Sequence, residues 1–170
     1  IYEKYPIHEL IIHPRIQTDM YRGVPRLGAY EKAVNRLKMP LCSNGNLFSA
    51  ADYKRITERF PDTCCFMYGR GLITNPGLVT EIREGIRPDK KTVREFHDCL
   101  FEEYRELLSG ERNVLFRMKE LWSYLAPMFT NNKKYAKKIK KAEKCVVYEN
   151  AVRELFGCEQ LIGEVSYRCS

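Results

Sequence analysis

The sequence has no long run of uncharged apolar residues, and no signal-peptide pattern opens it. A membrane-spanning helix needs about 18 or more apolar residues in succession, so none is expected here. The 170 residues are 44% hydrophobic and 30% charged, which is typical of a folded globular chain and not of a disordered one. At ~100–200 residues per domain, the length allows one domain or two small ones.

The seven cysteines include no CxxC pair and show no spacing typical of a structural zinc site. Their number is odd, and Cys64 and Cys65 are adjacent inside an apolar run, which does not suit a secreted disulfide framework. We therefore expect reduced thiols, a cytoplasmic location and no bound metal.

Acidic residues are fewer than basic ones, 22 against 29, which gives a net charge of +7. Most of this excess lies in residues 131–144, where one acid, Glu143, accompanies seven lysines: Lys133, Lys134, Lys137, Lys138, Lys140, Lys141 and Lys144. On a helix these lysines span a sector of about 160°. The residues expected on the opposite side are Tyr135, Ile139, Ala142 and Val146. The bland alternative is a solubilising surface, but like charges at this spacing repel, so the pattern favours binding of a nucleic-acid backbone.

The first half of the chain alternates between strand-like and helical patterns. Short β-rich runs lie at residues 9–13, 39–43 and 63–68, and this spacing is close to the ~30 residues of a βαβ unit, which predicts a parallel sheet. Ser49 followed by Asp52 predicts a helix start. A further short helix is expected to start at Asn75-Pro76 and to end at Gly85.

From Asp89 onward the sequence predicts helices only. One apolar stripe consists of Val93, Phe96, Leu100, Tyr104 and Leu107. Another consists of Val114, Met118, Leu121, Trp122 and Leu125. Residues 132–156 form a third helical stretch with a possible break near Tyr148. We expect a bundle of three or four helices, and the change of pattern predicts two domains, residues 1–87 and 88–170.

Polar motifs follow all three predicted strands: His13-Pro14-Arg15, Asn44-Gly45-Asn46 and Gly69-Arg70-Gly71. Ligands bind at the carboxyl edge of parallel sheets, and glycine-rich turns there can cradle a phosphate through backbone N–H groups. An arginine can add a charge-assisted contact to the same anion.

Each of these motifs also has a simpler explanation. The glycine-containing motifs can be tight turns, His13 can be a hydrogen-bonded histidine that caps a strand, and Arg15 and Arg22 can be surface ion-pair partners. The occurrence of all three motifs at one sheet edge favours a ligand site.

Three segments resemble the sixth, seventh and eighth strands of the tRNA-dihydrouridine synthases. The first contains Leu10-Ile11-Ile12-His13-Pro14-Arg15 and continues through Gln17-Thr18-Asp19-Met20-Tyr21-Arg22-Gly23. The second runs from Pro40 to Ser49, and the third from Met67 to Pro76. Order and spacing agree over residues 7–85, and the helices that follow suit the family's C-terminal tRNA-binding domain.

The resemblance implies a partial TIM (β/α)8 barrel of about three βα units, followed by a small all-α helical bundle domain. It also implies FMN at the barrel mouth, NADPH as reductant, and reduction of uridine to 5,6-dihydrouridine in tRNA. By the family pattern, His13 and Arg15 lie near the flavin, Asn44, Gly45 and Asn46 line the ribityl–phosphate path, and Gly69 and Arg70 hold the phosphate. The seven lysines would contact tRNA phosphates.

Two departures from the family pattern change the expectation. Asn46 stands where the family usually has aspartate, and no cysteine lies in the Asn-x-x-Cys-Pro context of the catalytic cysteine. A complete barrel takes ~250 residues. We therefore expect a C-terminal fragment that has no catalytic residue of its own, is inactive alone and self-associates through an uncovered sheet edge. Two alternatives stay open: a non-catalytic RNA-binding module on a barrel remnant, and another phosphate-binding TIM-barrel enzyme.

Overall fold

The computed structural model describes residues 1–163, so Cys169 lies outside the described residues. The chain divides between Gly71 and Leu72 into two compact units. None of the described helices is long and apolar enough to cross a membrane. The domain boundary that the sequence predicts between residues 87 and 88 stays a prediction.

The first unit is built on a parallel sheet with the strand order β1-β2-β3, as the sequence predicts. Its strands are β1 (Leu10–Ile12), β2 (Leu41–Asn44) and β3 (Cys65–Met67). Its helices are α1 (Leu27–Val34), α2 (Ala50–Arg59) and two 3-10 turns, η1 (Tyr2–Lys4) and η2 (Gln17–Asp19). Leu10 is paired with Leu41, and Cys42 with Cys65, so all three carboxyl ends lie at one edge.

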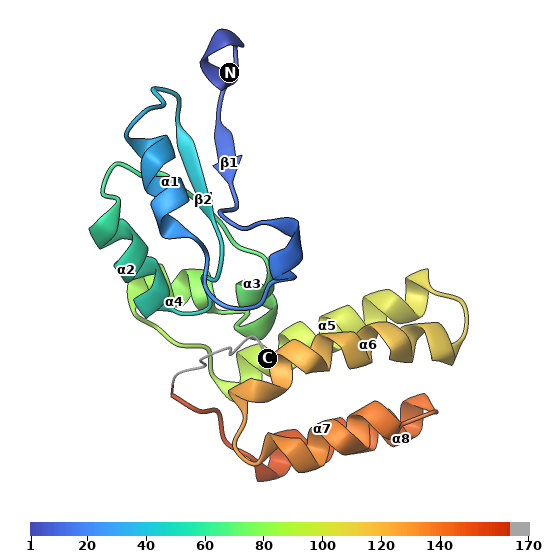
Figure 1. The fold of residues 1–170 in the computed structure, drawn as a ribbon. Coiled ribbons are helices and arrows are strands. Elements are labelled where there is room, and N and C mark those ends of the chain that lie inside the picture. Colours follow the sequence, from blue (N-terminus) through green and yellow to red (C-terminus); the bar gives the residue numbers. More distant parts are fainter. Residues whose placement is uncertain (164–170) are drawn as a thin grey trace. The chain divides into compact units, whose positions relative to one another are not determined.

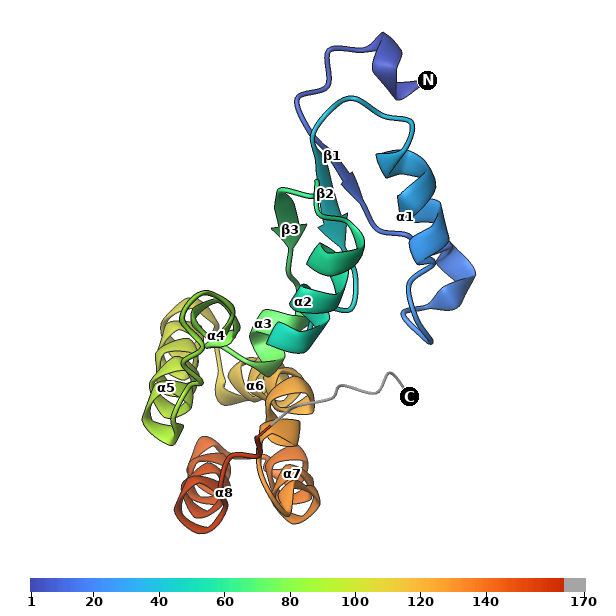
Figure 2. The ribbon, with the colours of Figure 1, turned by 90° about the vertical axis from the view of Figure 1, so that its left-hand side faces the viewer.

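Helices α1 and α2 pack against one face of this sheet (Figure 2). Leu10 and Ile12 of β1 contribute to the core beneath the helices, whereas Ile11 between them is 51% exposed. This alternation follows from the two-residue period of a strand. Tyr30 of α1 is fully buried, and its hydroxyl shares a hydrogen bond of 3.0 Å with Thr63.

The predicted start of α2 is confirmed. Ser49 Oγ accepts a hydrogen bond from the backbone N–H of Asp52 at 3.1 Å. The Asp52 carboxylate in turn accepts from the N–H of Phe48 at 3.0 Å. These bonds satisfy backbone donors that a helix start leaves unpaired.

The residues after β3 differ from the prediction. Arg70 begins a short helix, α3 (Arg70–Thr74), in a segment where no helix was predicted. The next helix, α4 (Leu78–Glu84), ends at Gly85 as expected but has Gly77 as its N-cap. Asn75 lies two residues before this N-cap, and its side-chain oxygen accepts a hydrogen bond from the N–H of Gly77 at 3.0 Å.

As far as residue 163, the remaining secondary structure of the second unit is helical apart from an isolated β-bridge between Phe129 and Leu161. Its elements are α5 (Lys90–Leu107), α6 (Glu111–Leu125), the 3-10 turn η3 (Ala126–Met128), α7 (Asn132–Lys141) and α8 (Cys145–Cys158). Helices α5 and α6 run antiparallel, as do α7 and α8 (Figure 1). The predicted stripe on α6 is buried throughout. Helices α5 to α8 lie within the predicted range of three or four helices.

Three details of the helical prediction were wrong. The last helical stretch breaks at Ala142, whose extended backbone (ψ 128°) ends α7, and not near Tyr148, which is fully buried inside α8. Because the helical phase restarts after this break, Val146 is 65% exposed instead of lying on the apolar face. Leu107, at the end of α5, is 74% exposed for lack of a following turn to cover it.

Candidate functional site

The three strand ends of the first unit meet at the side chain of Asn46. Its Oδ1 atom accepts hydrogen bonds from Arg15 Nη2 at 3.1 Å and from Arg70 Nη2 at 3.3 Å. Arg15 follows β1, Asn46 follows β2 and Arg70 follows β3. Residues far apart in the sequence are thus brought together at the carboxyl edge of the sheet.

Arg15 anchors the loop that follows β1. Its guanidinium donates to the carbonyl oxygens of Arg22 at 2.5 Å and Gly23 at 2.7 Å, and Asn46 Nδ2 donates to the same Gly23 oxygen at 3.3 Å. An aspartate at position 46 could accept from the arginines but could not donate to Gly23. Asn46 also has φ +38°, a conformation that asparagine tolerates better than most residues. The hydrogen-bond partners of Arg15 are neutral, so its positive charge is left for an anion.

Arg70 lies against two aromatic rings. Its guanidinium carbon is 4.6 Å from the centroid of Tyr21 and 5.3 Å from that of Phe48. The Tyr21 ring also lies 5.7 Å from the ring of His13. Cation–π contacts of this kind fix the orientation of a guanidinium. The sequence alone did not predict a role for Tyr21. Its position in the first of the three family-like segments could have identified it as a candidate site residue.

His13 and Arg15 carry buried polar atoms that lack hydrogen-bond partners within the described residues: His13 Nδ1, His13 Nε2 and Arg15 Nε. Groups of this kind are rare in native structures, because buried polar atoms are usually satisfied by protein, by water or by a bound ligand. Gly45 beside them has φ +146°, and a Cβ there would lie 3.1 Å from Pro25 and 3.8 Å from His13 Nδ1. Both this conformation and the close approach of the Pro25 ring therefore favour glycine at position 45.

Two predicted site residues take less part in this cluster. Asn44 turns to the sheet, where its Nδ2 donates to the sulfur of Met67 at 3.2 Å. Gly69 has no atom within 4 Å of the position a Cβ would take, so its backbone is open on that side. His13, Arg15, Gly45, Asn46 and Arg70 form the local cluster, which we call the strand-end cluster.

The second predicted site is the lysine surface, and all seven of its lysines are exposed. Tyr135 and Ile139 of α7 are buried on the opposite side. Lys138 forms an ion pair with Glu154 of α8, and this hydrogen bond and charge hold the pKa of Glu154 below its usual value. Lys144 lies beyond α7, as the N-cap of α8.

Sequence reasoning missed a buried polar network in the second unit. His97 of α5 is 2% exposed, and its Nδ1 lies 2.7 Å from Asp98 Oδ1 while its Nε2 lies 2.5 Å from the Tyr148 hydroxyl. Trp122 Nε1 donates to that hydroxyl at 2.7 Å. The i,i+4 spacing of His97 from the buried residues Val93 and Phe101 was a signal, because it places a histidine on an apolar helix face.

Burial shapes the acid–base properties of this network. It lowers the pKa of His97 from its ordinary value, against the opposing hydrogen bond and charge of Asp98. Burial also raises the pKa of Tyr148. The neutral histidine therefore donates from Nδ1 to Asp98 and accepts at Nε2 from the tyrosine hydroxyl.

The described cysteines are free thiols. Sγ of Cys64 lies 3.8 Å from Sγ of Cys65, and the hydrogen bond between Cys65 and Glu9 helps to raise the pKa of Cys65 to about 12. Within residues 1–163 no three His, Cys, Asp or Glu side chains gather in a way that could hold a metal ion.

Comparison with known proteins identifies the family. A sequence model described as dihydrouridine synthase (Dus) matches residues 3–159. The chain belongs to this family. It is also 29% identical over 121 residues to a tRNA-dihydrouridine(16) synthase from Shewanella oneidensis, and the aligned part covers 69% of this chain and 37% of that protein. The strand-end cluster and the lysine surface therefore belong to a Dus-family chain that spans well under two thirds of its relative's length.

Proposed function

We propose that this Dus-family chain takes part in the reduction of uridine to 5,6-dihydrouridine in tRNA, by supplying a flavin-phosphate site and tRNA-binding helices. The observation that carries this proposal is the meeting of three strand ends at Asn46, beside partnerless buried nitrogens of His13 and Arg15. The whole enzyme would combine a TIM barrel, of which residues 1–87 form the last part, with the helical domain at residues 88–170.

The residues of the strand-end cluster fit FMN. Arg70, together with the open backbone at Gly69, suits the phosphate, because a guanidinium makes charge-assisted bonds to phosphate oxygens. Gly45 and Asn46, which follow β2, suit the ribityl chain. His13 and Arg15 have nitrogens available for the polar edge of the flavin ring. The bound flavin, reduced by NADPH, would supply the hydride for the uracil ring.

The chain's own residues then act by binding and positioning. Tyr21 and Phe48 contact the Arg70 guanidinium through their rings, and Asn46 accepts a hydrogen bond from one of its nitrogens. Because Asn46 is neutral, the cluster keeps more positive charge for a phosphate than the family's usual aspartate would leave. No cysteine of this chain has the context of the catalytic proton donor, so the proposal assigns it no catalytic residue.

Replacing Arg70 by alanine tests the flavin site. In the protein with its complete barrel, Arg70→Ala is expected to weaken FMN binding about tenfold or more, because a hydrogen bond to a charged group contributes ~1.5–3 kcal/mol. The measurement is an FMN titration followed by quenching of flavin fluorescence. Arg59→Ala is the matched control, since Arg59 is an arginine of the same unit that pairs with Glu31 on the surface. Equal FMN affinity for Arg70→Ala and the parent would remove Arg70 from the phosphate site.

The lysine surface is the proposed contact for tRNA phosphates. A triple variant, Lys137→Gln/Lys141→Gln/Lys144→Gln, is expected to weaken tRNA binding about tenfold at physiological salt. The slope of log K against log salt should also become shallower by roughly 0.7–0.9 for each phosphate contact removed. Filter binding at several salt concentrations measures both quantities.

The control for this variant keeps the change in net charge constant. Lys54→Gln/Lys91→Gln/Lys119→Gln removes three lysines from α2, α5 and α6, and Lys54 and Lys91 lie beside Glu58 and Glu95. If the two triple variants lose tRNA affinity equally, binding depends on net charge alone and α7 is not the interface.

A second candidate is a non-catalytic RNA-binding module that keeps the barrel remnant as a scaffold, and the seven exposed lysines at residues 133–144 are the observation that favours it. Tight tRNA binding without FMN retention by the complete protein would support this alternative. Self-association and a cytoplasmic location stay predictions. The outer strands β1 and β3 carry Ile11 and Met67, both well exposed, and sedimentation at tens of micromolar tests whether such edges associate.

A further inference from the structure

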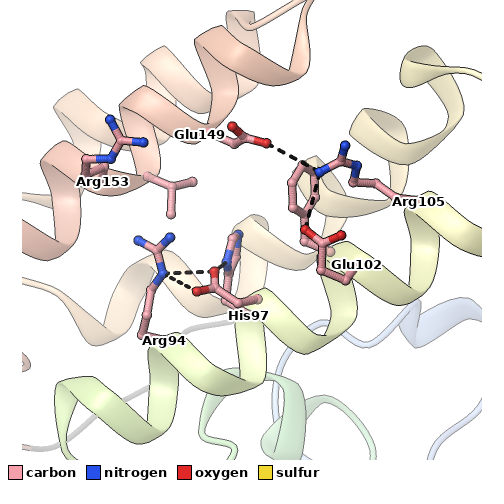
Figure 3. Close-up of a pocket in the computed structure, with 9 residues that line it drawn as sticks. Arg94, His97, Glu102, Arg105, Glu149 and Arg153 are labelled. Atoms are coloured by element: carbon pink, nitrogen blue, oxygen red, sulfur yellow. Dashed lines mark hydrogen bonds and ion pairs between the residues drawn. The ribbon is translucent and has the colours of Figure 1, made fainter.

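A pocket of about 350 Å³ opens between α5 and α8 within the second unit. Its lining includes Arg94, His97, Glu102, Arg105, Glu149 and Arg153 (Figure 3). This volume lies in the range of small-molecule sites. The two helices run antiparallel here, since Arg105 lies near Glu149 while Lys90 Nζ donates to the carbonyl oxygen of Phe156 at 2.8 Å.

One end of the pocket is rich in guanidinium groups. Arg94 and Arg153 lie on the same side of the pocket, from α5 and α8 respectively (Figure 3). Arg94 uses Nε to bind both oxygens of Asp98, at 2.8 and 2.7 Å, and within residues 1–163 no hydrogen bond engages its terminal nitrogens. Arg153 contacts only the neutral Asn150, at 3.3 Å, and pairs with no carboxylate of the described residues. Two arginine forks with spare donors match the oxygens of a phosphate.

The opposite end of the pocket carries carboxylates. Glu102 and Glu149 lie near Arg105, at 3.3 and 4.0 Å from its Nη1 atom (Figure 3). Two carboxylates share this one arginine, so oxygen lone pairs remain to accept hydrogen bonds from a ligand. Phe101 and Val152 supply apolar surface in the lining. The arginine end therefore offers the terminal guanidinium donors of Arg94 and Arg153 beside the Asp98 carboxylate, which also lines the pocket, and the other end offers acceptors.

We infer that this pocket binds a phosphorylated ligand whose far end carries hydroxyl or amino groups, the chemical class of a nucleoside monophosphate. Arg94 and Arg153 bind the phosphate, and Glu102 and Glu149 accept hydrogen bonds from the sugar hydroxyls or base amino groups. The site involves neither the strand-end cluster nor the lysine surface. A test of this pocket is therefore independent of the tests of the proposed function.

The pocket is connected to the only tryptophan of the chain, which provides a direct readout. Arg94 binds Asp98, Asp98 binds His97, and His97 meets the Tyr148 hydroxyl to which Trp122 donates. A phosphate on Arg94 changes the electrostatics at the outer end of this chain of hydrogen bonds. Occupation of the pocket should therefore change the fluorescence of Trp122.

The test compares cytidine 5′-monophosphate, cytidine and inorganic phosphate by calorimetry and by Trp122 fluorescence. The monophosphate is expected to bind at least tenfold more tightly than either of its parts, because both ends of the pocket are used. Arg153→Gln should weaken monophosphate binding about tenfold. Glu149→Gln should weaken the monophosphate but leave inorganic phosphate unchanged.

Two controls separate this site from other cationic surfaces. Arg117→Gln changes an exposed arginine of α6 that pairs with Glu120 and should leave binding unchanged. Arg70→Ala removes the phosphate contact proposed for the first unit and should not abolish the Trp122 response. Circular dichroism establishes that each variant is folded.

The inference is overturned if cytidine and its monophosphate bind equally, if neither binds, or if Arg153→Gln binds the monophosphate as the parent does. A dinucleotide without terminal phosphate distinguishes the source of the ligand. Tighter binding of the dinucleotide assigns the pocket to a phosphodiester of an RNA strand. Tighter binding of the monophosphate assigns it to a free nucleotide.

Discussion

Replacement of Tyr148 by phenylalanine is expected to lower the free energy of unfolding of the helical unit by about 2–4 kcal/mol. The change removes one oxygen atom and leaves the packing of a fully buried ring almost intact. However, it leaves the N–H of Trp122 and Nε2 of His97 without their hydrogen-bond partner. Each unsatisfied buried polar group costs roughly 1–3 kcal/mol.

The measurement is urea unfolding followed by Trp122 fluorescence, which reports the helical unit because the chain has a single tryptophan. Tyr104→Phe is the matched control, since Tyr104 is a partly buried tyrosine of the same core and no hydrogen bond of its hydroxyl is recorded among the described residues. The cycle of Tyr148→Phe with His97→Phe measures the coupling between the two side chains, expected at about 0.5–3 kcal/mol. A loss below 0.5 kcal/mol for Tyr148→Phe, or a loss equal to that of Tyr104→Phe, contradicts this role of the network.

The sequence was sufficient for features that depend on local periodicity. The spacing of the apolar runs predicted the parallel sheet, and Ser49 with Asp52 predicted the start of α2, because capping bonds form between residues close in the chain. The stripe on α6 was predictable for the same reason. The polar strand ends were correctly expected to meet, since parallel strands place their carboxyl ends at one edge.

Features that depend on pairing between distant residues could not be predicted. The partners of Arg15 include backbone carbonyls of its own loop. Every residue carries a backbone carbonyl, so the sequence does not show which of them accepts a hydrogen bond. The His97 network joins three helices, α5, α6 and α8, and the relative rotation of those helices decides which side chains meet. The phase of α8 was mispredicted because Ala142, an ordinary helix former, adopts an extended backbone there.

The mixed charges of the pocket between α5 and α8 explain why the sequence did not reveal it. Opposite charges at i,i+3 or i,i+4 positions, such as Arg94 with Asp98 and Glu102 with Arg105 on α5, are typical of an ordinary solvated helix surface. The packing of α5 against α8 places the guanidinium groups of Arg94 and Arg153 at one end of the pocket and the carboxylates of Glu102 and Glu149 at the other (Figure 3). The function of such residues depends on which of them already form ion pairs within the protein, and only the structure shows these pairs.

The stability of the helical unit is also expected to fall as the pH decreases below about 6.5. A histidine in the unfolded chain has a pKa near 6.5. Burial holds the pKa of His97 below that value in the folded protein, and Asp98, which favours the charged form, does not fully offset burial. Between the folded and unfolded pKa values the unfolded chain therefore binds more protons, so acid favours unfolding.

The sign and the size of this effect follow from linkage. The contribution of His97 is complete above about pH 6.5 and is lost as the pH falls toward the folded pKa, at up to about 1.4 kcal/mol per pH unit. Asp98 does not interfere in this window. Burial tends to raise its pKa, but Arg94 and His97 lower it below the usual carboxyl value, so its contribution is lost only at more acidic pH.

Urea unfolding at pH 7.5, 6.5 and 5.5, again followed by Trp122 fluorescence, measures this dependence. The parent should lose up to about 1 kcal/mol between pH 6.5 and 5.5 through His97, whereas His97→Phe, although less stable at pH 7.5, should show a flatter profile. The comparison of slopes separates titration of His97 from loss of packing, because packing alone would shift the whole profile without changing its shape. Parallel profiles for the parent and His97→Phe would assign the acid sensitivity to other groups.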